Sequence, residues 1–241
     1  MSRTYDLVIF DLDGTLCDTA PDIERCLNRA MREFGLPEVP HDRVLKAIGP
    51  GGKAFYRAIL PDSIVESGED YLPLAEKIVE RYRAYYTEST TELTRPFPGV
   101  LETLDDLRDL GVLVAVASNK PQEQTRKIVA ELGLSRYFLE VIGPESVEHP
   151  KPEPDMPRLI MERADVSPGR TLMVGDTDND MNAGRAAGAT TVFATWGYMT
   201  QGEIDERNID LVVERPGELV RIVVNAARDA VERASPVIPE T

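Results

Sequence analysis

The sequence has 241 residues, of which 42% are hydrophobic and 29% charged, a composition typical of a soluble globular protein with one large or two modest domains. Its formal net charge of −15 disfavours contact with nucleic acid and with anionic membranes, and no apolar stretch approaches the roughly 20 residues of a membrane-spanning helix. The two cysteines show neither metal-type spacing nor a disulfide framework, and the N-terminus lacks the pattern of a signal peptide, so we expect a cytoplasmic protein.

Short, continuous apolar runs recur along the chain and predict strands buried on both faces. The runs are Leu7–Phe10, Leu113–Ala117, Leu139–Ile142, Thr171–Val174, Thr190–Ala194 and Leu211–Val213. Helical patterns lie between most of them, at Pro98–Leu110, Gln122–Leu132 and Asn179–Ala187, and an apolar stripe from Leu219 to Ala230 predicts a last helix. Strands that alternate with helices predict an α/β fold with a doubly wound parallel sheet, in which ligands bind beyond the carboxyl ends of the strands.

Residues 17–93 interrupt this alternation, because they contain no comparable apolar run. Ala20–Phe34 and Asp70–Thr87 predict helices, with shorter helical pieces and the turn Gly49-Pro50-Gly51-Gly52 between them. We therefore expect a smaller helical cap domain at 17–93, inserted after the first strand. The α/β core would then be discontinuous and comprise 1–16 and 94–241.

Two carboxylates directly follow the first predicted strand, in the segment Asp11-Leu12-Asp13-Gly14-Thr15. Aspartate, glycine and threonine are also typical of a capped turn, so the segment alone fits a structural role equally well. A charge at the end of a buried strand, however, needs a compensating cation. The position therefore favours a functional site.

A second acidic segment, Gly175-Asp176-Thr177-Asp178-Asn179-Asp180, follows another buried strand. Acids in the first turn of a helix are favoured by the helix dipole alone, which explains Asp178 without a function. The dipole does not explain an acid at the strand tip itself. Grouped with Asp11 and Asp13, the residues Asp176 and Asp180 would form an oxygen site suited to Mg²⁺.

Two basic or polar segments complete the pattern. Ser118-Asn119-Lys120 follows the strand that ends at Ala117, where a hydroxyl and backbone N–H groups at a helix start can hold a phosphate oxygen. The same segment also fits an ordinary helix N-cap. Lys151 lies between two prolines, which stiffen the chain and can aim the side chain at a fixed target.

In this order, Asp-x-Asp-Gly-Thr, Ser-Asn, Lys-Pro and Gly-Asp-x-x-x-Asp resemble the motifs of the haloacid dehalogenase superfamily. Within it, the chain is most similar to the phosphoglycolate phosphatases. That likeness rests on five further segments: Asp18–Ile23, Asn28–Ala30, Pro98–Val100, Ser118–Pro121 and Trp196–Tyr198.

The resemblance implies a role for each matched residue. Asp11 would be the nucleophile that forms an aspartyl-phosphate, and Asp13 the general acid and base. Ser118, the Asn119 backbone and Lys151 would bind phosphate. The Asp11 carboxylate, the Asp13 carbonyl and Asp176 would bind Mg²⁺, with Asp180 supporting the metal through water or indirect contacts.

The resemblance implies a helical cap that closes over the site. Lys53 and Arg57, beside the Gly49–Gly52 turn, are candidates for binding a substrate carboxylate, although this turn also fits a simple connector. Pro50 interrupts the glycine pattern expected from the family, and Glu148-His149-Pro150 before Lys151 is unusual for the phosphoglycolate phosphatases. Both departures concern the substrate more than the reaction.

We expect an enzyme, a phosphatase for one small phosphorylated metabolite, with 2-phosphoglycolate as the first choice. Pyrophosphate, nucleotide monophosphates and sugar phosphates remain open. A phosphosugar mutase is disfavoured because Asp22 and Arg25 stand where such mutases resemble one another in a His and a Lys. A catalytically silent binding protein is disfavoured because every carboxylate of the motif is present. A monomer and a homodimer are both compatible with the sequence.

Overall fold

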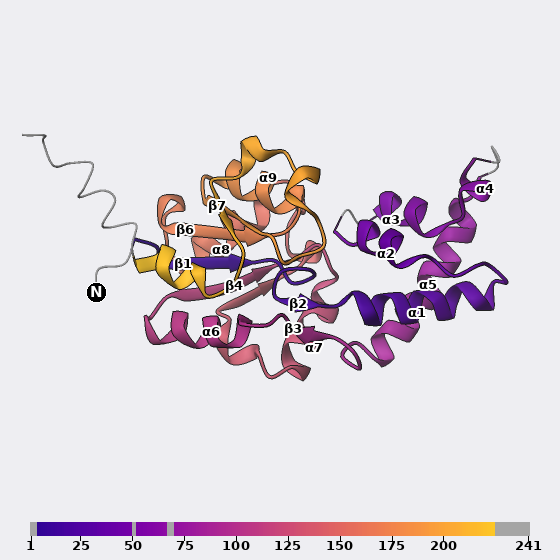
Figure 1. Ribbon diagram of the computed structural model, residues 1–241, viewed down its shortest axis with the longest axis horizontal. Helices are drawn as coiled ribbons and strands as arrows, with labels where there is room; N and C mark the ends of the chain where they lie inside the picture. The colour runs from indigo at the N-terminus through magenta and orange to yellow at the C-terminus, as the bar shows by residue number, and fades with distance from the viewer. Residues whose placement is uncertain (1–3, 50–51, 67–69, 225–241) are drawn as a thin grey trace, which may run out of the picture.

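The computed structural model describes residues 4–49, 52–66 and 70–224. Its centre is a parallel sheet with strand order β5-β4-β1-β6-β7-β8 (Figure 1). The strands are β1 (Leu7–Phe10), β4 (Leu113–Ala117), β5 (Glu140–Ile142), β6 (Thr171–Gly175), β7 (Thr190–Ala194) and β8 (Leu211–Val213). From β1, the chain adds β4 and then β5 on one side and β6, β7 and β8 on the other, as in doubly wound sheets. The predicted fold class is therefore confirmed.

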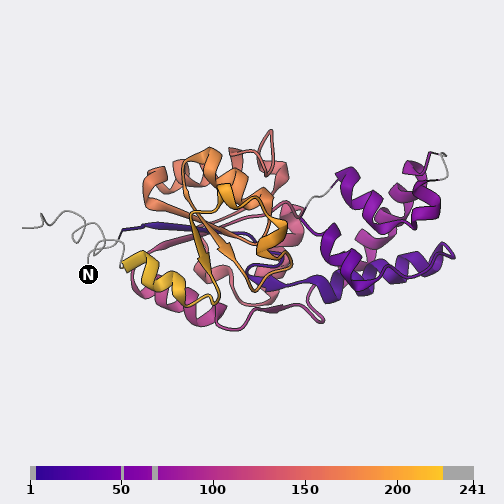
Figure 2. The same cartoon turned by 45° about the horizontal axis from the view of Figure 1, so that its top comes forward.

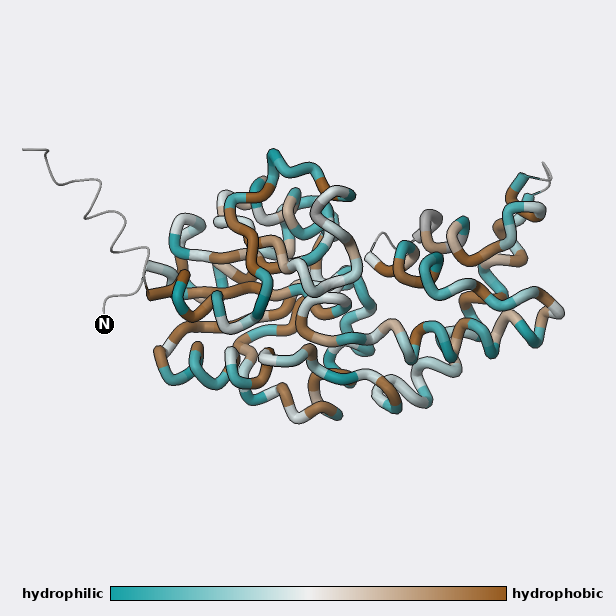
Figure 3. Tube along the Cα trace, in the orientation of Figure 1, coloured by the Kyte–Doolittle hydropathy of each residue, from teal (hydrophilic) through white to brown (hydrophobic). Residues whose placement is uncertain are grey.

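Each face of the sheet is covered by helices, because successive side chains of a strand point to opposite faces. Val8 and Phe10 belong to one apolar cluster, and Leu7 and Ile9 to another. The first cluster includes residues of α6 (Val100–Asp109), α7 (Gln122–Glu131) and a helical turn at 218–224; the second includes residues of α8 (Asp155–Ala164) and α9 (Asp178–Ala187). Hydrophobic segments accordingly run through the centre of the sheet in Figure 3.

Most predicted elements of the core are found within one or two residues of their expected ends. The strand expected at Leu139–Ile142 begins at Glu140, and the helix expected at Pro98–Leu110 covers Val100–Asp109. Only the start of the last predicted helix can be compared, because residues 225–241 lie outside the described ranges. None of the described helices is long and apolar enough to cross a membrane.

Between β2 (Cys17–Asp18) and β3 (Arg95–Pro96), which pair antiparallel, the chain forms a helical insert. Its helices are α1 (Ala20–Glu33), α2 (His41–Ala47), α3 (Gly52–Ile59), α4 (Asp62–Val65) and α5 (Leu72–Glu88). The long helices α1 and α5 pack side by side, because Ile23, Leu27 and Met31 form a buried stripe at helical spacing on α1. Figures 1 and 2 both show the insert beyond one end of the sheet.

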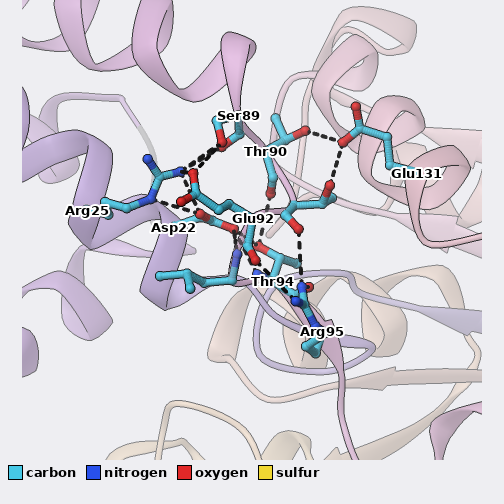
Figure 4. Close-up of polar contacts among 10 residues, drawn as sticks. Asp22, Arg25, Ser89, Thr90, Glu92, Thr94, Arg95 and Glu131 are labelled. Atoms are coloured by element: carbon cyan, nitrogen blue, oxygen red, sulfur yellow. Dashed lines mark hydrogen bonds and ion pairs between the residues drawn. The ribbon is translucent and has the colours of Figure 1, made fainter.

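The returning chain after α5 is bound to the start of α1 by one buried carboxylate (Figure 4). Asp22 Oδ2 accepts hydrogen bonds from the Leu93 and Thr94 backbone N–H groups, both at 2.8 Å, and from Thr94 Oγ1 at 2.9 Å. Its Oδ1 accepts from Arg25 at 2.7 Å, and Arg25 also donates to the Ser89 carbonyl at 3.1 Å. The two chain segments that join the insert to the core are thereby fixed to each other.

The same returning chain is also bound to the core. Thr90 Oγ1 and Thr91 Oγ1 donate to Glu131 Oε2 on α7, at 2.8 and 2.7 Å (Figure 4). The segment from Ser89 to Thr94 therefore has polar partners on both sides, which makes it the mechanical link between the insert and the core.

We expect Asp22→Asn to lower the free energy of unfolding by about 2–4 kcal/mol, because the donors of Leu93 and Thr94 and the Arg25 guanidinium lose a charged acceptor. Burial raises the pKa of Asp22, but hydrogen bonds from Arg25, Leu93 and Thr94 outweigh it and hold the pKa below its ordinary value. A lowered folded-state pKa stabilises the protein above the unfolded-state value of about 4 and loses that effect as the pH falls below it.

Urea unfolding at several pH values measures this effect. The difference in the free energy of unfolding between wild type and Asp22→Asn should have its full size at pH 7 and become smaller below about pH 4. The matched control is Asp62→Asn in the same insert, whose exposed ion pair with Arg43 should contribute less than about 1 kcal/mol. Equal effects of the two substitutions at pH 7 would contradict this account of the linker.

Candidate active site

The carboxyl ends of β1, β4 and β6 meet at one cavity of about 800 Å³, which the helical insert covers. Parallel pairing in register, Phe10 beside Val116 and Val174, brings the three following loops together. Among the residues that line the cavity are Asp11, Asp13, Ser118, Asn119, Lys120 and Lys151 from the core, and Ile23, Ile48, Phe55, Val79, Tyr82 and Arg83 from the insert.

Asp11 is 5% exposed and lies 2.9 Å from the Lys151 Nζ atom through its Oδ1. Apart from this ion pair, no residue in the described part of the chain donates a hydrogen bond to that oxygen. Burial raises the pKa of Asp11 to about 7; the ammonium of Lys151 opposes this shift, and the charges of Asp180 and Asp13 add to it. A buried carboxylate that faces a cavity with an unused lone pair is able to act as a nucleophile.

Lys151 connects two of the predicted acids. Its Nζ lies 2.9 Å from Asp11 Oδ1 and donates to Asp180 Oδ1 at 2.6 Å. Burial by itself would lower the pKa of Lys151, but the charges of Asp11 and Asp180 outweigh it and raise the pKa. The side chain is therefore a fixed, permanently charged cation beside Asp11.

Asp176 is fully buried and held on both oxygens. Thr15 Oγ1 donates to its Oδ1 at 2.7 Å, and the Tyr198 backbone N–H to its Oδ2 at 2.8 Å. A Cβ atom on Gly14, which has φ +84°, would lie 2.3 Å from Asp176 Oδ2, so the glycine is required for this close approach. Burial, and after it the charges of Asp180 and Asp11, raise the pKa of Asp176 to about 8.

Asp180 is positioned by its own helix. Its Oδ2 accepts from the Thr177 N–H at 3.0 Å, as part of the capping box at the start of α9, and also from Thr177 Oγ1 at 2.6 Å. The other oxygen faces Lys151.

These acids fit a hard divalent cation. Asp11, Asp176 and Asp180 each offer a carboxylate oxygen, and the three atoms lie within 4.8 Å of one another. Burial, and after it the charges of neighbouring acids, raise the pKa values of Asp11 and Asp176, so a bound cation would favour their ionised forms. Oxygen ligands and buried negative charge are the conditions that Mg²⁺ favours, so the donor set agrees with the predicted cofactor class.

Asp13 takes part in a separate ion pair. Lys120 Nζ lies 2.9 Å from its Oδ1 and 3.1 Å from its Oδ2, and Thr19 Oγ1 makes a short hydrogen bond to Oδ1. Burial would lower the pKa of Lys120, but the charge of Asp13 outweighs it, so the pKa is raised. Asp13 is thus held at the cavity floor on the side of the insert.

Ser118 and Asn119 lie where the sequence places them, on the loop after β4. Ser118 is buried, and its Oγ accepts from the Lys120 N–H at 3.3 Å. The Asn119 side chain donates to the Lys151 carbonyl at 2.8 Å and to the Gly49 carbonyl at 3.3 Å. It therefore orients the loop that carries Lys151 and also contacts the insert.

The family model described as haloacid dehalogenase-like hydrolase matches residues 8–194. The chain belongs to the haloacid dehalogenase-like hydrolase family. A protein of Aquifex aeolicus named phosphoglycolate phosphatase is 36% identical over 219 residues, which cover 91% of this chain and 97% of that protein. A protein of Haemophilus influenzae (strain ATCC 51907) with the same name is 34% identical over 224 residues, covering 92% and 100%.

Solved structures agree. The crystal structure of a predicted phosphoglycolate phosphatase from Haemophilus somnus 129PT superposes with a TM-score of 0.82 at 27% identity and covers 91% of this chain and 98% of that one. The family resemblance read from the motifs is thereby confirmed, and so is the expectation of an enzyme of the phosphatase class.

The residues by which the insert of this haloacid dehalogenase-like hydrolase contacts the site differ from those expected from the sequence. Arg57 is exposed and is not among the residues that line the cavity, and the side chain of Lys53 lies outside the described residues, as do Pro50 and Gly51. The Gly49 carbonyl instead accepts hydrogen bonds from Asn119 and, at 3.1 Å, from Asn179. Gly49, the first residue of the glycine turn, is therefore docked against two core loops.

Several side chains that hold the site were not singled out as functional from the sequence. They are Thr15, which binds Asp176; Thr19 and Lys120, which bind Asp13; and Tyr86, whose ring lies 4.8 Å from Lys120 Nζ. Lys120 carries a usable signal, because it stands within three residues of a strand tip. Thr19 and Tyr86 lie on segments whose composition alone gives no such signal.

Proposed function

We propose that this chain is a Mg²⁺-dependent phosphatase that hydrolyses a small phosphomonoester through an aspartyl-phosphate on Asp11, with 2-phosphoglycolate as the substrate. The observation that carries the proposal is the buried Asp11 carboxylate at the cavity floor, next to Lys151 and to two further acids. The names of the relatives support the choice of substrate.

In the first step, an Asp11 oxygen attacks phosphorus, the ester P–O bond breaks, and Asp13 gives its proton to the leaving oxygen. In the second, water attacks phosphorus, Asp13 takes the proton of that water, and the bond to Asp11 breaks. Ser118, the Asn119 N–H and Lys151 would hold the phosphate oxygens and offset their charge.

The metal would be held by the Asp11 carboxylate, the Asp13 carbonyl and Asp176, with Asp180 in support, and it supplies positive charge for the phosphoryl oxygens. Residues 17–93 would act as a cap domain on the core of 1–16 and 94–241 and exclude water from the reaction. We do not extend the proposal to a mutase, because Asp22 and Arg25 are bound to the linker and neither lines the cavity.

Phosphate release from a panel of substrates tests the proposal. With Mg²⁺, kcat/KM should be highest for 2-phosphoglycolate and lower for pyrophosphate, nucleotide monophosphates and sugar phosphates, and EDTA should abolish turnover. A higher kcat/KM for another compound of the panel would contradict 2-phosphoglycolate as the substrate but not the mechanism. Full activity in EDTA would contradict the role of the metal.

Asp13→Ala should lower kcat for an alkyl phosphate by about 10²–10⁴-fold, because the leaving oxygen loses its proton donor. The loss should be smaller for p-nitrophenyl phosphate, whose leaving group departs without a proton. Steady-state rates on both substrates measure the difference. Equal losses on the two would show that Asp13 does not act as the general acid.

A further inference from the structure

Lys120 is a buried cation at the cavity to which the proposed mechanism gives no role. It is 8% exposed, it lines the cavity, and its ammonium contacts both oxygens of Asp13. On the other side, the ring of Tyr86 from the insert lies 4.8 Å from the Nζ atom. The ammonium therefore lies between the floor of the cavity and the insert.

A purely structural ion pair is the simplest explanation of this contact. Burying an ammonium is costly, and Asp13 compensates it. That explanation does not account for the location, because an ion pair that only supports the fold need not line the cavity at the acid–base residue. An ammonium has three donors, so Lys120 can keep one bond to Asp13 and direct another to a ligand.

The proposed chemistry places a substrate atom next to this ammonium. Asp13 must contact the ester oxygen, and Lys120 is one hydrogen bond from Asp13. In a 2-phosphoryloxy carboxylate, the carboxylate carbon is bonded to the carbon that carries the ester oxygen. With bonds of about 1.5 Å, a carboxylate oxygen lies about 3 Å from the ester oxygen, which is within the reach of the same ammonium.

Other cations of the cavity are less suited to this role. Lys151 is bound to Asp11 and Asp180, and Lys127 donates to the Thr87 carbonyl. Arg83 is exposed on the insert. A substrate with a distant anion would therefore use Arg83, whereas an anion next to the ester oxygen meets Lys120.

We propose that Lys120 is the specificity-determining residue of this site and that it binds the carboxylate of a 2-phosphoryloxy carboxylate substrate. The proposal rests on the phosphatase function above and deepens it, because it names the group that distinguishes this substrate class from other small phosphomonoesters. Tyr86 contributes the apolar and cation–π wall that keeps the ammonium in place.

The test compares 2-phosphoglycolate with 2-hydroxyethyl phosphate, which has the same skeleton with a neutral alcohol in place of the carboxylate. Lys120→Met should lower kcat/KM for 2-phosphoglycolate about 100-fold or more beyond any loss on 2-hydroxyethyl phosphate, the size expected when a charged partner is removed from a buried pair. Lys120→Arg should restore part of the preference. Lys127→Met, which removes a cation from the same cavity, should leave the ratio between the substrates unchanged.

Binding gives a second measurement that is independent of turnover. In the Asp11→Asn background, calorimetry with Mg²⁺ present should show that 2-phosphoglycolate binds more tightly than 2-hydroxyethyl phosphate, and that adding Lys120→Met removes the difference. Lys120→Gln serves in its place if Lys120→Met does not fold.

Equal losses on both substrates, or a preference that survives in the binding experiment, would overturn the proposal and leave Lys120 as a residue that only positions Asp13. Failure of the phosphatase proposal looks different. In that case the wild type releases no phosphate from either compound, and the binding preference alone decides the role of Lys120.

Discussion

Asp11→Asn is expected to abolish phosphate release while the protein stays folded. The substitution removes the nucleophile, and loss of a nucleophile in an enzyme that forms a covalent intermediate lowers kcat by about 10⁴–10⁶-fold. The fold should survive because Lys151 keeps its bond to Asp180, and because an asparagine removes one of several crowded negative charges. Circular dichroism and the urea midpoint would check the fold.

The matched control is Asp109→Asn, an exposed acid on α6 that does not line the cavity, which should leave kcat unchanged. Acid quenching of the Asp13→Ala variant during turnover, followed by peptide mass analysis, should find a phosphoryl group on the peptide that contains Asp11. Activity of Asp11→Asn at the level of the control, or a phosphoryl group on another residue, would rule out the proposed nucleophile.

Asp176→Asn is expected to have opposite effects on function and on stability. Without this carboxylate the metal site loses a ligand, so activity should fall to the level measured in EDTA. In metal-free protein at pH 8, however, the variant should unfold at a higher temperature than the wild type. Both hydrogen bonds of the side chain can persist in the variant. The amide NH₂ of the new asparagine can donate to the Thr15 hydroxyl, and its carbonyl oxygen can accept from the Tyr198 N–H.

The expected pH dependence follows from the raised pKa of Asp176. Its pKa of about 8 in the folded protein lies above the unfolded value of about 4, so the folded state binds the additional proton between these limits. The stability of the metal-free wild type should therefore fall as the pH rises from about 4 to 8, and less so in Asp176→Asn.

Thermal unfolding with and without Mg²⁺ measures both effects. Mg²⁺ should raise the melting temperature of the wild type and of Asp109→Asn at pH 8 and have little effect on Asp176→Asn. An Asp176→Asn variant that Mg²⁺ stabilises as strongly as the wild type would exclude Asp176 from the metal site. A variant less stable than the wild type in EDTA would contradict the conclusion that the buried charge of Asp176 destabilises the metal-free fold.

The fold class and the location of the site could be predicted because both depend on buried parallel strands. Apolar runs such as Leu7–Phe10 have no stable position except between two layers of helices, and polar residues at their carboxyl ends then share one edge of the sheet. Asp11, Ser118 and Asp176 were predicted together for this reason, and the structure brings them to one edge.

The contacts that depend on loop paths could not be predicted in this way. Periodicity carries no information on which way Lys120 turns after β4, or on which insert helix covers it. The strands β2 and β3 have only two residues each and no apolar pattern. Arg57 was selected for its charge and its distance from a glycine turn, yet its helix leaves it exposed and away from the cavity lining.

The docking of Gly49 has a consequence for the speed of the enzyme. Among the described residues, Asn119 and Asn179 each donate a neutral hydrogen bond to the Gly49 carbonyl. Each such bond contributes about 1 kcal/mol net, so breaking both would cost about 2 kcal/mol, and we expect an undocked population of a few per cent at equilibrium. Such transitions take microseconds to milliseconds, which allows substrate entry and product exit without a limit on turnover at ordinary rates.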